Sequence, residues 1–196
     1  MKPAIIAISG TPGTGKTEVA KILAKRLDAN LITVPLLLRK KQLGYGYDKK
    51  RRTKVIDEKD LEKAVKKNIS GDKINIVESH LAHLIKSGSV FVLRANPDAL
   101  EKRLKKRGWP AAKIRENIEA EMLDGTTIEA LQKNENVYEI DTSSAGAEKT
   151  AGVILKILNN HYGKKYRAGK ISWTEKYGKI LTRNLSRRNR LAKPKR

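Results

Sequence analysis

Residues 10–17 have the types and spacing needed to bind a phosphate group. They read Gly-Thr-Pro-Gly-Thr-Gly-Lys-Thr, which fits the phosphate-binding pattern G-x-x-x-x-G-K-[ST]. Gly10, Gly13 and Gly15 leave the backbone free to turn several N–H groups into one concavity. Lys16 is expected to reach the β- and γ-phosphates of a nucleotide, and the Thr17 hydroxyl to ligate Mg²⁺.

The segments around this loop support the phosphate site. Residues 4–8 form a short apolar run that is typical of a buried parallel strand. After the loop, apolar side chains recur at helical spacing, so the order is strand, loop, helix. A helix that begins here directs its N-terminal N–H groups and its dipole at the anion. A glycine turn without a ligand is the alternative, and the surrounding order disfavours it.

A second group of candidate residues follows the apolar run at residues 74–77. This run ends in Glu78-Ser79-His80. Ligands of open α/β sheets lie outside the carboxyl ends of the strands, where an acidic residue holds Mg²⁺ directly or through water. His80 is then expected near the γ-phosphate. His83 competes for that role, and a structural histidine is the alternative at either position.

The elements that must position these residues alternate along the chain. Apolar runs predict five strands near residues 4–8, 31–34, 74–77, 89–93 and 137–141, with helices between them and a closing helix over 145–161. Pro35 is expected to end the second strand. This alternation predicts an α/β fold, with a parallel sheet covered by helices on both faces.

Two of the predicted helices meet at Arg107-Gly108-Trp109. Asn96 is expected to cap the first helix, with Pro97 in its first turn. Its leucines are expected to point inward, and Arg103, Lys105, Lys106 and Arg107 outward. The corner suits a small lid, with Arg107 directed back toward the phosphates.

Residues 36–68 are too polar for a core layer and too long for an ordinary loop. They hold a basic cluster around Gly44-Tyr45-Gly46-Tyr47-Asp48, and a helix is expected from Glu58 to Asn68. The cluster comprises Arg39, Lys40, Lys41, Lys49, Lys50, Arg51, Arg52 and Lys54. We interpret the segment as an insertion over the phosphate site that binds a second substrate. A solvated helical hairpin remains the alternative.

Composition limits the class of protein. The chain has 196 residues, no cysteine and a net charge of +22, which favours a polyanionic partner such as RNA over mere solubility. The lack of cysteine excludes disulfides and is compatible with a reducing, cytoplasmic setting. No apolar run approaches membrane-spanning length, so no membrane contact is expected.

The last segment, residues 163–196, carries much of this charge. It holds thirteen lysines and arginines against the single Glu175, a net +12. Trp173, Tyr177 and Leu181 are spaced by four, which indicates a basic amphipathic helix that forms on binding. We expect this segment to contribute to RNA or ribonucleoprotein binding and little to chemistry. The alternatives are a disordered solubility arm, a segment that folds back on the active site and alters kinase activity, and binding to a calmodulin-like protein or a membrane surface.

Several of these stretches, in this order, resemble the atypical adenylate kinases of the isoenzyme-6 type. The resemblance covers roughly residues 3–160 and rests on the loop at 10–17, Gln42–Asp48 with Ile56-Asp57-Glu58, Glu78-Ser79-His80, Val90–Arg94, and Arg107-Gly108-Trp109 with Asn117-Ile118. It implies a nucleoside monophosphate kinase fold over residues 1–162, with a monophosphate-binding insertion near 33–56 and a lid near 106–116. It also implies a role in small ribosomal subunit maturation, through a ribosomal protein of the platform region.

The resemblance assigns roles to individual residues. Gly13, Gly15, Lys16, Thr17 and residue 18 would hold ATP, with Arg107 on the phosphates. Two positions depart from the family: Glu78 stands where an aspartate is usual, and Glu18 replaces a small polar residue but could still offer its backbone N–H. The basic segment after residue 162 does not match the family's ordinary C-terminus.

Two functional hypotheses follow. In the first, the protein transfers the γ-phosphoryl of ATP to AMP, with slow ATP hydrolysis as a side activity; Lys16, Mg²⁺ on Thr17 and Arg107 neutralise charge, and Arg39 orients the acceptor monophosphate. In the second, it is an ATP-switched assembly factor that releases a ribosomal protein or ribosomal RNA on hydrolysis. Glu78 and His80 would then position the attacking water.

Overall fold

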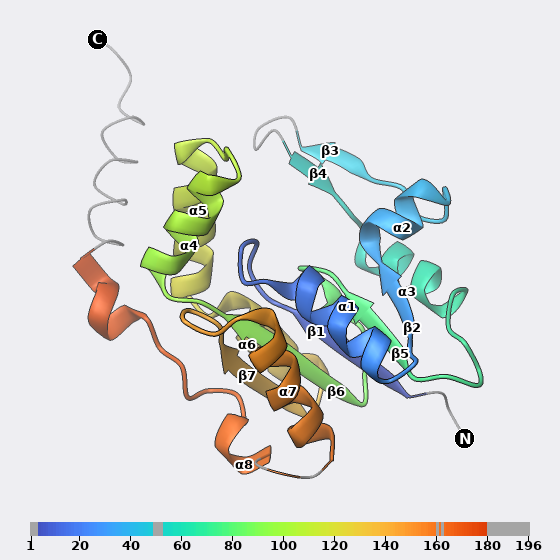
Figure 1. Cartoon of the computed structure of the whole chain (residues 1–196). Helices are drawn as coiled ribbons and strands as arrows, with labels where there is room; N and C mark the ends of the chain where they lie inside the picture. Colours follow the sequence, from blue (N-terminus) through green and yellow to red (C-terminus); the bar gives the residue numbers. More distant parts are fainter. Residues whose placement is uncertain (1–3, 49–52, 160, 162, 180–196) are drawn as a thin grey trace.

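A computed structural model describes residues 4–48, 53–159, 161 and 163–179 and is built on a five-stranded parallel sheet (Figure 1). The strand order is β2-β5-β1-β6-β7. The strands are β1 (Ile5–Ser9), β2 (Asn30–Thr33), β5 (Asn75–Glu78), β6 (Ser89–Arg94) and β7 (Val137–Asp141). The α/β class and the five parallel strands predicted from the apolar runs are confirmed.

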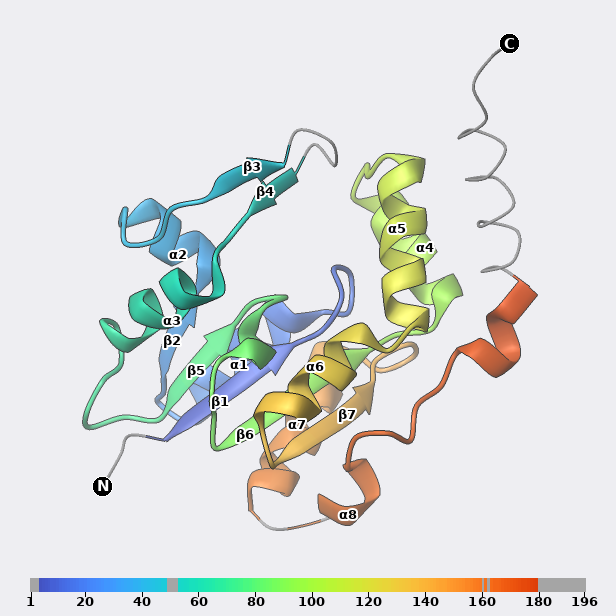
Figure 2. The same ribbon diagram turned by 180° about the vertical axis from the view of Figure 1, so that it is seen from behind.

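Helices cover both faces of the sheet and make it the middle of three layers. Successive residues of a strand point to opposite faces, so Ile6 and Ile8 pack on one side and Ala7 on the other. Helices α1 (Lys16–Arg26) and α7 (Ala147–Leu158) cover the first face (Figure 1). Helices α3 (Glu58–Lys66) and α6 (Gly125–Lys133), with the short 3₁₀ helix η1 (Ala82–Leu84), cover the second (Figure 2).

The register of the sheet brings the two candidate groups together. Ile8 of β1 pairs with Glu78 of β5, and Ser79 N–H donates to the carbonyl of Ile8 over 3.3 Å. The phosphate loop leaves β1 directly after Ser9. Parallel strands therefore deliver the loop and Glu78-Ser79-His80 to the same edge of the sheet, as the sequence predicted.

The predicted lid helices are α4 (Pro97–Lys106) and α5 (Ala111–Met122). Asn96 Oδ1 accepts from the N–H of Ala99 over 2.8 Å, and Pro97 occupies the first turn, which confirms the predicted helix start. Their apolar faces form a separate cluster. Helix α6 was not predicted, because it is too short for its apolar residues to show a helical repeat distinct from that of the preceding helix.

The insertion differs from the prediction in two ways. Val34 and Pro35 lie in helix α2 (Val34–Arg39), where Thr33 Oγ1 accepts from Leu36 N–H and Pro35 stands in the first turn, so Pro35 begins a helix and does not only end a strand. The segment also contains an antiparallel pair, β3 (Gly46–Asp48) and β4 (Thr53–Val55), so a purely helical hairpin is wrong. Residues 49–52, which hold four members of the basic cluster, lie outside the described residues.

The chain after residue 162 continues along the domain. Helix α8 (Gly163–Tyr166) leads to Arg167, which forms an isolated antiparallel β-bridge with Tyr138 of β7. The next residue, Ala168, donates its N–H to the carbonyl of Val137 over 3.1 Å. Residues 174–179 are helical in the chain alone, whereas a helix that forms only on binding was expected from the spacing of Trp173, Tyr177 and Leu181. The remaining basic residues of the predicted tail, from 180 onward, lie outside the described part of the chain. Within that part, no helix has the length and apolarity to cross a membrane.

Candidate nucleotide-binding site

The phosphate loop depends on glycine at two points for different reasons. Gly10 has φ +134°, and a Cβ there would stand 2.2 Å from the carbonyl oxygen of Leu93. Gly15 has φ +92°, yet a Cβ would meet no other atom within 4 Å. The first glycine lets the loop lie against β6, whereas the second supplies a left-handed turn before α1 and leaves an open space beside the backbone.

Lys16 is a buried cation that rests on the loop itself. Its Nζ donates to the carbonyl of Thr11 over 3.1 Å, and the side chain is almost wholly buried. Burial lowers the pKa of Lys16 from 10.5 to about 8, against the opposing charges of Glu78 and Glu121. Among the described residues no carboxylate lies within ion-pair distance of Nζ. Such an ammonium is suited to an incoming anion.

Thr17 and Glu78 lie together at the start of α1 and the end of β5. Thr17 Oγ1 donates to Glu78 Oε1 over 3.4 Å, and the two side chains offer oxygen ligands at one point of the cleft. Burial raises the pKa of the Glu78 carboxyl, although the charge of Lys16 opposes this. Mg²⁺ prefers oxygen ligands and usually binds one or two protein groups beside substrate phosphates and waters. These residues fit that requirement.

The structure separates the two histidines that compete near the γ-phosphate position. His83 is buried, with Nδ1 2.8 Å from Ser9 Oγ and Nε2 2.8 Å from Glu129 Oε2, so both ring nitrogens are already used. His80 remains accessible and lines the cleft. Desolvation of the ring and the positive charge of Lys16 lower the pKa of His80, which favours a neutral ring at pH 7. His80 is therefore the histidine available to a ligand.

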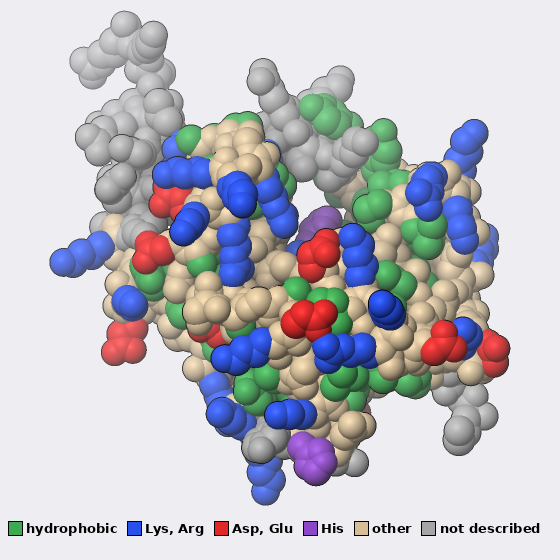
Figure 3. Space-filling view, in the orientation of Figure 1, with side chains coloured by type: hydrophobic (Ala, Val, Ile, Leu, Met, Phe, Trp, Pro, Cys, Tyr) green, Lys and Arg blue, Asp and Glu red, His purple; other side chains and the backbone are tan. Residues whose placement is uncertain are grey.

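A cleft of about 1050 Å³ opens over the loop between the lid helices and the insertion. Figure 3 shows this hollow, with Lys and Arg side chains on its α4–α5 side. Besides the loop, it is lined by Val34, Pro35, Leu38, Tyr45, Ile56, Glu78, Ser79, His80, Arg107, Gly108, Trp109, Pro110, Lys113, Glu116, Asn117, Ala120 and Thr126. The insertion side of the lining is thus mostly apolar, whereas the α4–α5 side mixes Arg107 and Lys113 with Glu116 and apolar residues.

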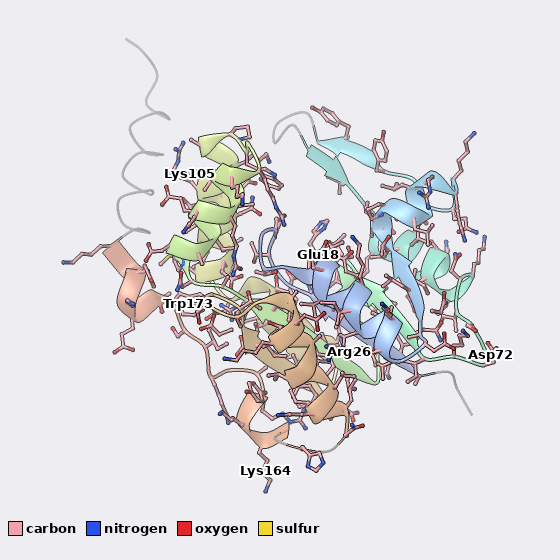
Figure 4. The ribbon with its side chains drawn as sticks, viewed as in Figure 1. Glu18, Arg26, Asp72, Lys105, Lys164 and Trp173 are labelled. Atoms are coloured by element: carbon pink, nitrogen blue, oxygen red, sulfur yellow. The ribbon has the colours of Figure 1, made fainter. Side chains whose placement is uncertain are left out.

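Most sequence-predicted residues meet in this cleft, and one does not. Gly13, Gly15, Lys16, Thr17, Glu18, Glu78, His80 and Arg107 all line it. Glu18 lies at the start of α1 (Figure 4), and its Oε1 accepts a hydrogen bond from Lys21 Nζ over 3.2 Å. Arg39 is exposed at the end of α2 and is not part of the lining. Its assignment to the acceptor phosphate stays a prediction.

Arg103 corrects the prediction that all basic residues of α4 point outward. Its guanidinium donates to Gly13 carbonyl over 3.2 Å and to Thr142 Oγ1 over 3.2 Å, and it also reaches the carbonyls of Thr142 and Ser143. The side chain is half-buried. It thus ties α4 to the phosphate loop and to the end of β7. Its position one residue before Leu104, within a run of cations, gave no signal of this.

The sequence also gave no role to Glu121 on α5. Its carboxylate is buried and accepts from Arg94 Nε at 2.6 Å and Thr11 Oγ1 at 2.5 Å. Arg94 itself is fully buried at the end of β6, and Glu121, Asp124 and Glu139 surround its guanidinium. An acidic residue on the apolar face of a predicted helix, together with an arginine at the end of a buried strand, was the available signal.

Known proteins are similar to this chain in sequence. A family described as AAA domain matches residues 6–124, which include the loop, the insertion and the lid corner. A protein from Thermococcus kodakarensis named "Putative adenylate kinase" is 37% identical over 177 residues, covering 90% of this chain and 97% of that protein. The chain belongs to the adenylate kinase family.

Two further relatives carry the same name. The protein of Methanocaldococcus jannaschii is 38% identical over 177 residues, covering 90% of this chain and 97% of its own. That of Archaeoglobus fulgidus is 40% identical over 171 residues, covering 86% and 91%. The family's sequence likeness therefore extends well beyond the loop and over most of the chain.

Solved structures share the fold at low identity. Shikimate kinase from Acinetobacter baumannii, in complex with shikimate, has a TM-score of 0.54 and 13% identity, covering 82% of this chain and 94% of that one. The YorR protein of Bacillus subtilis, in complex with phosphorylated GDP, has a TM-score of 0.51 and 17% identity, covering 80% and 96%. At these identities the likeness shows the P-loop kinase fold alone.

Proposed function

We propose that the protein is a nucleoside monophosphate kinase that transfers the γ-phosphoryl of ATP to AMP and forms two ADP. The observation that carries this proposal is the cleft itself. It joins a phosphate loop, whose buried lysine has no ion pair within the described part of the chain, to an apolar wall on the insertion and to a lid arginine. A cleft with two walls can accommodate a donor and an acceptor nucleotide.

The donor triphosphate would lie along the phosphate loop. Backbone N–H groups near Gly13 and Gly15 and the start of α1 would bind its phosphate oxygens, and Lys16 would move from the Thr11 carbonyl to the β- and γ-phosphates. Thr17 and Glu78 would hold Mg²⁺, which supplies charge neutralisation for the phosphates when bound.

The acceptor would enter from the insertion side. Val34, Pro35, Leu38 and Ile56 offer apolar surface for a nucleobase, as does the ring of Tyr45. An oxygen of the AMP phosphate then attacks the γ-phosphorus, and the bond between that phosphorus and the bridging oxygen of ADP breaks. The reaction needs positioning and charge neutralisation more than covalent chemistry by the protein.

Arg107 would complete the site from the lid. Its side chain is exposed in the cleft at the corner between α4 and α5. A guanidinium that approaches the transferring phosphoryl neutralises charge that develops there. Closure of the lid over both nucleotides would exclude water and favour AMP over hydrolysis.

Slow ATP hydrolysis is the side activity that the cleft supports. With no acceptor bound, a water molecule could occupy the acceptor position. His80, kept neutral by its lowered pKa, could accept a hydrogen bond from that water beside Glu78. This assigns His80 to hydrolysis more than to ATP affinity.

A ribonucleoprotein partner is the second proposal, and it rests on charge. The net charge of +22 and the +12 after residue 162 favour a polyanionic partner such as ribosomal RNA. The resemblance to the isoenzyme-6 type of adenylate kinase adds a small-subunit platform ribosomal protein as the second partner, in the cytoplasm. Phosphoryl transfer and ATP-driven release of such a partner use the same loop, so the two activities are compatible.

Product analysis tests the kinase proposal. The protein is incubated with Mg²⁺ and ATP, alone and with AMP, CMP, GMP or UMP in turn, and the nucleotides are separated. A kinase converts at least one monophosphate to its diphosphate, and AMP is the expected acceptor. ATP loss at one rate in all five mixtures, with every monophosphate unchanged, would leave only the ATPase.

A further inference from the structure

The segment after residue 166 binds two buried carboxylates at the base of the lid. Glu139 Oε2 accepts from the N–H groups of Gly169 at 2.8 Å and Lys170 at 3.2 Å. Trp173 Nε1 donates to Glu121 Oε1 over 3.2 Å, and Tyr177 Oη donates to Asp98 Oδ2 over 2.9 Å. We call residues 167–177 the strap, since they run from β7 to α4 and α5 (Figures 1 and 4).

The strap is packed as well as hydrogen-bonded. Tyr177 is buried and Trp173 half-buried in the cluster formed by the apolar faces of α4 and α5. Figure 4 shows Trp173 at the base of these helices. The same two helices carry the lid corner at their other end. The strap is therefore part of the folded domain at the point from which the lid rises.

Glu121 links the strap to the phosphate loop. Oε1 accepts from Arg94, from Ala95 N–H at 3.1 Å and from Trp173, whereas Oε2 accepts from Thr11 Oγ1 at 2.5 Å. Both oxygens of one buried carboxylate are thus used, and Arg94 forms an ion pair with it at 2.6 Å. A carboxylate fixed by donors from β6 and the strap sets where the Thr11 hydroxyl can lie.

Thr11 in turn anchors the phosphate loop, from which Lys16 would move to the phosphates when nucleotide binds. Its carbonyl accepts from Lys16 Nζ at 3.1 Å and from Thr14 Oγ1 at 2.8 Å. The contacts run without a gap from Trp173 through Glu121 and Thr11 to Lys16. We propose that Glu121 and Trp173 are positioning residues, through which the strap holds the phosphate loop in the conformation that binds nucleotide.

This inference rests on the proposed function only in taking ATP as the nucleotide at the loop. It makes the strap part of the nucleotide site, although none of its residues lines the cleft. The predicted effect lies in nucleotide binding, because an ordered loop binds phosphate without first losing conformational freedom. A strap that serves only as packing would affect stability alone.

Trp173→Phe tests the proposal, since it removes the indole N–H and keeps an aromatic ring in the cluster. Tyr177→Phe is the matched control: it removes a donor from the same strap and the same cluster, but one that binds Asp98. Loss of one hydrogen bond predicts that Trp173→Phe binds ATP roughly three- to tenfold more weakly than the wild type. Tyr177→Phe is expected to bind ATP with the wild-type affinity. Titration calorimetry gives the affinities, and thermal melting gives the stability of each variant.

A second pair of variants tests the route. Thr11→Ser keeps the hydroxyl that binds Glu121, whereas Thr11→Val removes it. If Trp173 acts through Glu121 and Thr11, the losses of ATP affinity in Trp173→Phe and Thr11→Val are not additive in the double variant, and Thr11→Ser binds ATP more tightly than Thr11→Val. In steady-state assays, KM for ATP should rise more than kcat falls.

Two results would overturn the proposal. One is an ATP affinity of Trp173→Phe equal to that of the wild type, with both strap variants melting earlier by similar amounts. The other is full additivity with Thr11→Val. ATP binding is read without any acceptor, so a failure of AMP phosphorylation would refute the proposed function and leave the strap inference standing.

Discussion

Among single residues, Lys16 affects both the stability of the free protein and its affinity for a nucleotide. The Lys16 ammonium rests on the Thr11 carbonyl, and burial lowers its pKa to about 8 although the charges of Glu78 and Glu121 oppose this. No carboxylate of the described residues forms an ion pair with it. A bound triphosphate would supply the missing charge. A group held in this way destabilises the free protein and strengthens the complex.

The pH dependence of stability tests this view of Lys16. Below pH 8 the lysine is protonated in both the folded and the unfolded chain; between about 8 and 10.5 only the unfolded chain keeps the proton. Folding is then favoured by rising pH, by about 3 kcal/mol at most over that window. Denaturant unfolding of wild type and Lys16→Met, without nucleotide, should show the wild type gaining stability relative to the variant between pH 7.5 and 10. A difference that stays constant with pH would contradict the lowered pKa.

His80 is the residue for which position and pKa both favour a role in hydrolysis. His80→Ala should leave ATP affinity close to the wild-type value and slow single-turnover hydrolysis by roughly tenfold to a hundredfold, since it removes an acceptor for the attacking water. His161→Ala, which changes an exposed histidine outside the cleft lining, is the control. If ATP affinity alone falls, or neither quantity changes, His80 is structural.

At the scale of helices and strands, sequence reasoning succeeded where the signal was local. Apolar runs located the five strands, and Asn96 with Pro97 located the start of α4. The glycine and lysine spacing located the loop, because its geometry is set by adjacent residues. The ends of adjacent strands also indicated that Glu78 and His80 lie beside the loop, whereas their roles stay predictions.

The failures have a different physical origin, since they depend on contacts between distant segments. Arg103 is held by groups that lie 39 and 90 residues away in the chain, and Glu121 joins Thr11 to Trp173. The sequence around Arg103 does not indicate which distant carbonyl groups accept hydrogen bonds from its guanidinium. Val34 and Pro35 continued an apolar run, and only the Thr33 cap turned them into a helix.

Arg103 joins α4, the phosphate loop and the end of β7 through its guanidinium. Arg103→Ala removes several donors to carbonyls in partly buried surroundings and should lower the free energy of unfolding by roughly 1–3 kcal/mol. Lys105→Ala changes an exposed residue of the same helix that pairs with Glu101, and should cost about 0.5 kcal/mol or less. Denaturant unfolding measures both. Equal, small losses would show that the Arg103 contacts add nothing to stability.

At the scale of the whole molecule, the charged end of the chain divides into two parts. Trp173 and Tyr177 of the strap pack against α4 and α5, whereas residues 180–196 contribute seven further cations and no acidic residue. A deletion meant to separate RNA binding from chemistry should therefore begin after residue 179. A deletion at residue 163 would also remove Trp173 and Tyr177 from the lid cluster.

Deletion of residues 180–196 should weaken binding to ribosomal RNA and leave AMP phosphorylation close to the full-length rate. Each phosphate contact that is lost lowers the log–log salt slope by about 0.9 for duplex and about 0.7 for single-stranded RNA. Binding measured at several salt concentrations, with kinase assays on the same protein, separates the possibilities. Unchanged RNA affinity and slope would indicate that this end only aids solubility.

The fate of the γ-phosphoryl group tests the function of the whole cleft most directly. ATP labelled at its γ-phosphate is mixed with AMP, Mg²⁺ and the protein, and the label is followed into ADP and inorganic phosphate. We predict that most of the label appears in ADP, that omitting AMP diverts a slower flow of label to inorganic phosphate, and that folded Lys16→Ala shows neither at the wild-type rate. Label that passes only to inorganic phosphate, at a rate indifferent to AMP, would contradict a nucleoside monophosphate kinase.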